Sequence, residues 1–387
     1  MAAINLPRTL EIGAKASTKL QEILARSGYT RPFLVVDRYL IESGLIERIL
    51  APLDIAGTTY RLFTDIVPDP TVAAVRTGLA ALAEDDYDCV VGIGGGSAID
   101  TAKAIAVFSV HGGEPSSYKA PHIQDAPGLP VIAIPTTAGT GSEATRIMVV
   151  TDETTDEKML CAGLAYLPVA ALVDYELTLT KPERLTVDTA IDSLTHAIEA
   201  YVSRRANPFS DGMAILAMRN IAGNIRIVVA DPANRAAREA LMLGATQAGI
   251  AFSNASVALV HGMSRPIGAF FHVPHGLSNA MLLPVVTEFS SGAALARYAD
   301  CARAMGFASD REGNQAAVAR LHGALRDLNR ELNVPTPRSF GIGEARWLAA
   351  IDQMATQALA SGSPGNNPRV PEHAEIVALY EKVWTEG

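Results

Sequence analysis

The first half of the chain alternates short apolar runs with amphipathic stretches, and this pattern constrains the fold more than any other feature. The runs at residues 31–37, 58–63, 88–94 and 130–135 are rich in β-branched residues and are expected to be strands. Helical patterns at 39–53 and 71–83 lie between them. Nearly continuous apolar strands that alternate with helices indicate a parallel sheet covered on both faces. We therefore expect an α/β domain over residues 1–180.

The strand patterns end after Pro182, and the rest of the chain is typical of helices. Helical periodicity is found at residues 189–203, 211–225, 233–252, 293–305, 315–332, 343–360 and 372–384. A chain of 387 residues exceeds the size at which single cores stop growing. We expect a second, all-α domain over residues 181–387, and an active site between the two domains, where ligand pockets often form.

Composition and charge exclude several classes of protein. A net charge of −9 argues against nucleic acid or an anionic membrane as a partner. The three cysteines, Cys89, Cys161 and Cys301, have no CxxC spacing, which fits a reducing compartment and disfavours a disulfide framework or a thiolate zinc site. We find no signal peptide and no apolar run as long as a membrane span. The expectation is a soluble, cytoplasmic protein.

Two histidine-bearing segments suggest a metal site. Asp192 and His196 are four residues apart in a helical pattern, which places both side chains on one face. His261 and His275 are each followed by glycine, in a stretch without an acidic residue. Three imidazoles and one carboxylate suit a divalent transition metal. An isolated buried histidine is more often a core residue whose hydrogen bonds are satisfied, so the spacing alone leaves both interpretations open.

A glycine-rich loop follows the third expected strand. Residues 94–100, from Gly94 to Asp100, lead from this strand into a helical pattern at 97–107. Glycines allow backbone N–H groups to approach a phosphate at a helix N-terminus, and Ser97 could cap the helix or donate to that phosphate. The loop lacks the spaced GxGxxG pattern, and a tight turn would also use glycines.

A second loop supports nucleotide binding. Residues 135–143 leave the fourth strand and are rich in hydroxyl groups and glycine. Loops at the carboxyl ends of parallel strands line the crevice where open α/β sheets bind ligands. Asp37 ends an earlier strand and could accept hydrogen bonds from an adenosine ribose, whereas it would repel a 2′-phosphate. It therefore favours NAD over NADP, unless it only caps a turn.

Together these motifs resemble those of the iron-containing (group III) alcohol dehydrogenases. The matching segments are Gly94-Gly95-Gly96-Ser97-x-x-Asp100, Pro135-Thr136-Thr137-Ala138-Gly139-Thr140, Asp192-x-x-x-His196 and His261-Gly262-Met263 with Pro274-His275-Gly276. The resemblance covers essentially the whole chain. It implies a Rossmann-like N-terminal domain and a helical C-terminal domain, as in dehydroquinate-synthase-like folds. It also implies a homodimer or larger homo-oligomer that acts on a small-molecule alcohol or aldehyde.

The resemblance assigns a role to individual residues. The metal ligands would be Asp192, His196, His261 and His275, with Fe(II) typical and Zn(II) an alternative. Phe252 would face the substrate. The residues at the pyrophosphate would be Gly95, Gly96 and Ser97, and the rest of the dinucleotide would be lined by Thr136, Thr137, Thr140, Thr145 and Lys158.

The implied chemistry is hydride transfer between the nicotinamide of NAD and a primary alcohol or aldehyde whose oxygen the metal polarises. Several relatives have a histidine where this chain has Arg265, and a guanidinium cannot accept the alcohol proton. We expect His272 to assist proton transfer, although it could equally be a packed or solvent-facing residue. Arg265 could pair with an anionic group on the substrate, or else with the cofactor or a buried acid.

Two kinds of enzyme on the same scaffold are alternatives. A metal-free reductase would not need the complete set of metal ligands. A dehydroquinate-synthase-like enzyme uses NAD without net formation of NADH. A non-catalytic NAD- or metal-binding protein is a third possibility, which any turnover of an alcohol or aldehyde would exclude.

Overall fold

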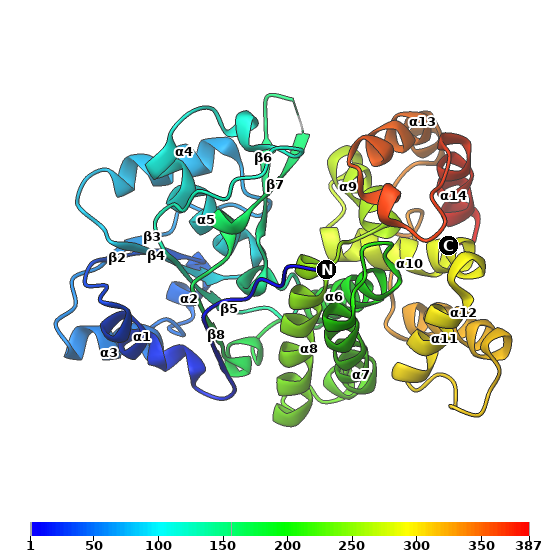
Figure 1. Cartoon of the computed structure of the whole chain (residues 1–387), viewed down its shortest axis with the longest axis horizontal. Coiled ribbons are helices and arrows are strands. Elements are labelled where there is room, and N and C mark those ends of the chain that lie inside the picture. The colour runs from blue at the N-terminus through cyan, green and yellow to red at the C-terminus, as the bar shows by residue number, and fades with distance from the viewer. Residues whose placement is uncertain (1, 156, 387) are drawn as a thin grey trace. The chain divides into compact units, whose positions relative to one another are not determined.

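A six-stranded parallel sheet forms the centre of the first of two structural units, which comprises Asn5–Lys181 (Figure 1). The computed structural model describes residues 2–155 and 157–386. The strands follow the order β1-β8-β5-β4-β2-β3. Their bounds are β1 Thr9–Ile12, β2 Pro32–Val36, β3 Arg61–Phe63, β4 Cys89–Gly94, β5 Val131–Pro135 and β8 Ala170–Val173.

Helices cover both faces of this sheet. On β2, Phe33 and Val35 pack with helices α4 (Val72–Leu82) and α5 (Gly96–His111). Leu34 and Val36 point to the opposite face and pack with α1 (Leu20–Ser27), α2 (Arg38–Glu42) and α3 (Glu47–Ile55). Figure 1 shows α4 and α5 on one side of the strands and α1 and α3 on the other. The two buried faces explain why β2, β4 and β5 are apolar throughout.

The order of the strands creates a switch point in the sheet. From β2 the chain moves outward to β3, and it then returns to β4 on the other side of β2. Open α/β sheets bind ligands outside the carboxyl ends of strands at such a point. Asp37 directly follows β2, and Gly94 ends β4, so both residues lie at this position.

The structure contains strands that the sequence patterns did not reveal. β1 and β8 extend the sheet, and an antiparallel pair, β6 (Ile147–Asp152) and β7 (Glu157–Ala162), forms a separate two-stranded sheet. The single helix expected at 39–53 is two helices, α2 and α3, because Gly44 adopts a left-handed conformation with φ 71°.

The second unit begins at Pro182, and all the elements described in it are helices; residues 2–4 also belong to it. α6 is buried over most of its length and packs against α7, α8 and α10. The helices are α6 Glu183–Val202, α7 Pro208–Ala230, α8 Arg235–Asn254, α9 Leu259–Phe271, α10 His275–Ser291, α11 Leu295–Ala304, α12 Asn314–Glu331, α13 Glu344–Ala360 and α14 His373–Glu386. Short 3-10 helices over both units are Ala16–Lys19, Pro115–Tyr118, Ser142–Ala144, Leu164–Tyr166, Tyr175–Thr178, Gly292–Ala294 and Ser363–Asn366.

Helices α9 and α10 were not expected from the sequence. Pro266 lies inside α9 and Pro284 inside α10, and both residues are usually read as helix breakers. These two helices carry His261 and His275, so they decide the geometry of the candidate metal site.

Helix α7 has no uninterrupted apolar run as long as a membrane span, but it passes a test of length and overall composition. By length and composition alone α7 could cross a membrane, and so could the bent pair α8 and α9 taken together. The apolar residues of α7 are interspersed with polar ones, which hides them from a search for uninterrupted runs. In the structure α7 packs against α6 and α8, and its Arg226 pairs with Glu331 of α12, as in a core helix with one polar face.

Candidate functional site

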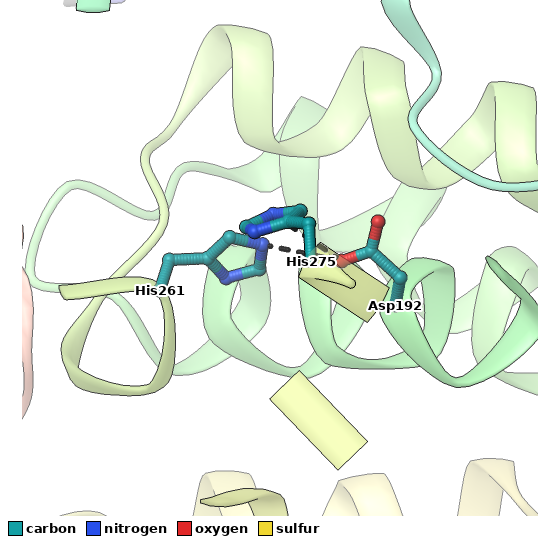
Figure 2. Close-up of side chains that lie close together, drawn as sticks. All are labelled: Asp192, His261 and His275. Carbon is teal, nitrogen blue, oxygen red and sulfur yellow. Dashed lines mark ion pairs between the residues drawn. The ribbon is translucent and has the colours of Figure 1, made fainter. Parts of the chain in front are cut away.

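Three helices bring candidate metal ligands together. α6 carries Asp192 and His196 one turn apart, α9 carries His261 in its first turn, and α10 begins at His275. The ligand atoms of Asp192, His261 and His275 all lie within 4.8 Å of one another. Figure 2 shows the two imidazoles and the carboxylate pointing toward one another. Segments distant in the sequence thus converge on one small volume.

The spacing of these atoms suits a single small cation. Asp192 Oδ1 lies 3.5 Å from His261 Nε2 and 3.8 Å from His275 Nε2. Ligands about 2.1 Å from a tetrahedral ion lie about 3.4 Å from each other. The His275 side chain is 35% exposed, whereas those of Asp192 and His261 are buried, so the group can be reached from solvent on the His275 side.

His196 lies next to this group without being part of it. Its Nε2 is 4.0 Å from Asp192 Oδ1, and its ring stacks between those of His261 and Phe252, each at 4.3 Å between centroids. His196 Nδ1 is buried and has no hydrogen-bond partner within residues 2–155 and 157–386. The contact with Phe252 means that this aromatic residue supports a candidate ligand ring directly.

Charges in the group favour the metal-binding protonation state of Asp192 and of His196, but not that of His261. Burial raises the pKa of Asp192, but the surrounding imidazoles outweigh this effect and hold it well below its usual value. Burial lowers the pKa of His196 to about 3, so the ring is neutral at pH 7. Burial also disfavours charged His261, yet hydrogen bonds to Asp192 and Glu199 raise the pKa of His261. An anionic carboxylate and neutral imidazoles are the forms that bind metal.

Two further side chains belong to the site and were missed by the sequence reasoning. Asn279 Nδ2 donates to Asp192 Oδ1 at 2.6 Å and lies 3.2 Å from His261 Nε2 and 3.3 Å from His275 Nε2. Glu199 accepts a hydrogen bond from His261 Nδ1 at 2.7 Å. Helical spacing is the signal that could have found them, since Glu199 is seven residues after Asp192 and Asn279 is four after His275.

The glycines that follow the two histidines permit close helix packing. A Cβ on Gly276 would lie 2.4 Å from the Asp188 carbonyl oxygen on α6. A Cβ on Gly262 would lie 2.8 Å from Pro364. Both distances are shorter than real Cβ contacts. Gly276 therefore allows α10 to approach α6, and so brings His275 close to Asp192.

The other candidate catalytic residues have different surroundings. Arg265 is half-buried on α9, one turn after His261, and its Nη1 donates to Ser363 Oγ at 3.1 Å. Burial lowers the pKa of Arg265 to about 10, which leaves it cationic at pH 7. His272 is exposed at the C-terminus of α9 and has a left-handed backbone with φ 55°.

The two loops expected to bind a dinucleotide lie against each other in the first unit. Gly94 has φ 155°, a conformation that favours glycine. A Cβ on Gly95 would contact Thr137 at 3.5 Å, and a Cβ on Gly96 would lie 2.7 Å from Thr140 Cγ2. α5 begins at Gly96 without a side-chain cap, so the N–H groups of its first turn are available to an anion.

Asp100 and Thr145 take part in a buried network that holds the second loop. Asp100 accepts from Ser142 Oγ at 2.5 Å and from the Val149 N–H at 2.9 Å. Lys103, which the sequence reasoning also missed, donates to Ser142 Oγ, Thr145 Oγ1 and two backbone carbonyls. These contacts tie α5 to the second loop and to β6, so Asp100 and Thr145 help to position that loop.

The remaining dinucleotide candidates surround the start of α5. Lys158 Nζ pairs with Asp69 at 2.9 Å, and the Asp69 N–H donates to Ser97 Oγ at 3.3 Å. Thr136 Oγ1 is buried and finds no hydrogen-bond partner in the described part of the chain. Asp37 caps α2 by accepting from the Tyr39 N–H at 3.1 Å.

Comparison with known proteins gives matches over nearly the whole chain. Residues 7–175 match the family model described as iron-containing alcohol dehydrogenase, and residues 186–384 match the Fe-containing alcohol dehydrogenase family, C-terminal. Lactaldehyde reductase of Escherichia coli (strain K12) is 35% identical over 385 residues, which cover 98% of both chains.

Solved structures give the same result. The crystal structure of a 1,3-propanediol oxidoreductase is 33% identical, with a TM-score of 0.94 over 99% of this chain and 100% of that one. A sulfoacetaldehyde reductase from Bifidobacterium kashiwanohense in complex with NAD+ is 26% identical, with a TM-score of 0.89 over 100% of both chains.

Proposed function

Because the chain belongs to the iron-containing alcohol dehydrogenase family, we propose that Asp192, His196, His261 and His275 hold its metal ion. The protein is a metal-dependent, NAD-linked alcohol dehydrogenase or aldehyde reductase whose cofactors are NAD and a divalent metal, with Fe(II) the first candidate and Zn(II) an alternative. The observation that carries the ligand assignment is that ligand atoms from α6, α9 and α10 lie within 4.8 Å of one another.

The donor set fits a divalent metal. A carboxylate and imidazoles are ligands that divalent transition metals prefer, and ligand atoms of Asp192, His261 and His275 lie within 4.8 Å of one another. A metal at this position supplies a Lewis acid that polarises a carbonyl oxygen or acidifies a hydroxyl group. The protein supplies an anionic carboxylate, a neutral His196 ring and the flat face of Phe252, which packs against that ring.

We assign dinucleotide binding to residues 1–180, and metal and substrate binding to residues 181–387. Gly94, Gly95, Gly96 and Ser97 would bind the pyrophosphate at the start of α5. Thr136, Thr137, Thr140 and Lys158 would contact the rest of the dinucleotide, while Asp100 and Thr145 would hold the second loop in place. Asp37 lies at the switch point of the sheet, where its carboxylate would accept from a ribose hydroxyl.

We propose that His272 passes the substrate proton to solvent. It is exposed and lies three residues before His275, so a proton could pass from it directly to water. If His272 has this role, His272→Ala will alter the pH–rate profile of alcohol oxidation. An unchanged profile would show that His272 only caps the C-terminus of α9.

The position and charge of Arg265 favour a substrate that carries an anionic group. It is a half-buried cation one turn from His261, and a guanidinium binds carboxylates and sulfonates through paired hydrogen bonds. The sulfoacetaldehyde reductase among the similar structures is named for such a substrate. We propose that this enzyme prefers a short aldehyde that carries an acid group over its neutral analogue.

An anaerobic assay tests the proposed function. The protein would be freed of metal, loaded with Fe(II) or Zn(II), and screened with NAD or NADH against neutral and acid-bearing alcohols and aldehydes. We expect net NADH formation with a primary alcohol, and a higher kcat/KM for the acid-bearing aldehyde that falls to the neutral value in Arg265→Met. Equal activity with and without metal would indicate a metal-free reductase, and turnover without net NADH would indicate a synthase-type reaction.

We also propose that the enzyme is a cytoplasmic homodimer or larger homo-oligomer. β1 is an edge strand that pairs only with β8 among the described residues, and the nearby Leu6 and Ile12 are exposed. Exposed edge strands readily pair with another chain. The three cysteines are buried free thiols, which suit a reducing compartment. Light scattering of the purified protein tests the oligomeric state.

A further inference from the structure

Glu199 is a buried carboxylate on α6 whose oxygens are directed at the beginning of α9. It is only 3% exposed, and it lies on the same helix as Asp192 and His196. A buried carboxylate is costly unless hydrogen bonds compensate for its lost hydration. The contacts of Glu199 therefore need an explanation.

Glu199 accepts three hydrogen bonds from one segment. Its Oε1 accepts from the Val260 N–H at 2.6 Å, and its Oε2 accepts from the Ala258 N–H at 2.8 Å and from His261 Nδ1 at 2.7 Å. α9 has no side-chain cap of its own. Glu199 thus satisfies backbone donors at the start of α9 and holds the imidazole of His261 at the same time.

The contact with Glu199 determines which nitrogen of His261 carries the proton. An ionised carboxylate can only accept hydrogen bonds, so the hydrogen lies on Nδ1 of His261. The lone pair of Nε2 then points away from Glu199, toward Asp192 Oδ1 at 3.5 Å. The amide of Asn279 supports this assignment independently, because its Nδ2 donates toward His261 Nε2 at 3.2 Å.

We propose that Glu199 is a positioning residue for the metal site, which fixes the ring orientation and the tautomer of His261 so that Nε2 is available as a ligand. The proposal rests on the assignment of His261 as a metal ligand. Metal-binding histidines commonly donate their second ring N–H to a carboxylate, and loss of that partner weakens metal binding about 10- to 100-fold.

The alternative is that Glu199 only caps α9, and a Glu199→Gln variant separates the two roles. With its oxygen in the place of Oε1, glutamine can still accept from the Val260 N–H, whereas the bond from the Ala258 N–H is lost together with that from His261. The glutamine NH2 group, however, cannot accept from His261 Nδ1. In the variant we expect the ring proton of His261 to move to Nε2, where it competes with a cation.

Tyr380→Phe is the matched control. The Tyr380 hydroxyl is buried and donates to the Met263 carbonyl of α9 at 2.7 Å, two residues after His261. Its loss removes a buried hydrogen bond from the same helix and leaves the His261 ring untouched. A general loosening of α9 would therefore affect both variants alike.

Zn(II) affinity, measured by competition with a chromophoric chelator, is the first test. We expect Glu199→Gln to bind Zn(II) about 10- to 100-fold more weakly than the wild type, and Tyr380→Phe to bind it like the wild type. If the wild type binds Zn(II) and Glu199→Gln binds it equally well, the role of Glu199 is wrong while the proposed function stands. If the wild type binds no divalent metal, the proposed function itself fails.

Nitrogen-15 NMR of the histidine rings gives a second test, which needs only the wild-type protein. In the metal-free wild type at alkaline pH, the proposal requires the Nδ1–H tautomer of His261. An Nε2–H tautomer would overturn it, even if Glu199→Gln could not be purified.

Discussion

Asn279 donates through Nδ2 to Asp192 Oδ1 across 2.6 Å, inside the group of candidate ligands. The same nitrogen lies within hydrogen-bond distance of Nε2 of both His261 and His275. An amide donor and a cation would therefore compete for the same lone pairs. In the metal-free protein Asn279 compensates the buried charge of Asp192, and this role becomes dispensable once a metal is bound.

The first prediction concerns Asn279→Ala. Loss of the donor leaves Asp192 without a buried hydrogen bond, and the metal-free protein should lose about 1–3 kcal/mol of stability. Added Zn(II) should then raise the Tm of the variant by more than it raises that of the wild type. Asn329→Ala is the control, because Asn329 donates to the Ala280 carbonyl of α10 and contacts no candidate ligand. An identical Zn(II)-induced shift in Asn279→Ala and the wild type would contradict this role.

The second prediction concerns Gly276→Ala. The added methyl group would lie 2.4 Å from the Asp188 carbonyl oxygen, so α10 must move away from α6. We expect a loss of about 1–3 kcal/mol from overpacking, together with weaker Zn(II) binding because His275 moves away from Asp192. Urea denaturation and chelator competition measure the two effects.

The control for this variant is Gly223→Ala on α7. Gly223 is exposed, and nothing lies within 4 Å of the position that a Cβ would occupy. Replacing glycine by alanine in an open helical position should stabilise the protein by about 0.5–1 kcal/mol. If Gly276→Ala behaves like Gly223→Ala, the close approach of α10 and α6 is not required.

The fold of the first unit was largely predictable because it depends on local patterns. The four expected strands are present: β2, β4 and β5 are buried on both faces and must be apolar throughout, while β3 is a partly exposed edge strand. β6 and β7 escaped prediction because they lie outside the main sheet and alternate buried with more exposed residues. Their existence depends on pairing with each other, which no local pattern encodes.

The candidate site was only partly predictable. Asp192 and His196 follow helical spacing, but the helices around His261 and His275 were hidden by internal prolines. Glu199 and Asn279 were missed because an acid or an amide on a helix is most often a solvated residue. Their roles arise only when α6, α9 and α10 pack together, and that packing depends on contacts between residues far apart in the sequence.

The third prediction concerns the pH dependence of metal binding. The pKa of His261 is raised above its ordinary value, whereas burial holds that of His196 at about 3. A proton on His261 competes with the metal, so the apparent affinity should fall at least about tenfold per pH unit below the raised pKa. His196 should add no further loss until the pH approaches 3. Zn(II) titrations from neutral to acidic pH check this slope, and a constant affinity would contradict it.

The fourth prediction concerns cofactor choice. Asp37→Gly and Asp37→Asn both remove the negative charge beside the switch point, and both should increase the kcat/KM for NADP relative to NAD. Asparagine and glycine are tolerated as helix N-caps, so the cost in stability should be only a few tenths of a kcal/mol. Steady-state kinetics with both cofactors measure the ratio. An unchanged ratio in both variants would leave Asp37 as the cap of α2 alone.

The most direct test of the account is anomalous diffraction from crystals loaded with Fe(II) or Zn(II), recorded at the absorption edge of the metal. We predict one strong peak per chain, bound by Asp192 Oδ1 and by Nε2 of His261 and His275, with His196 as the fourth protein ligand. A peak elsewhere in the chain, or crystals that take up no metal, would contradict the assignment of these four residues.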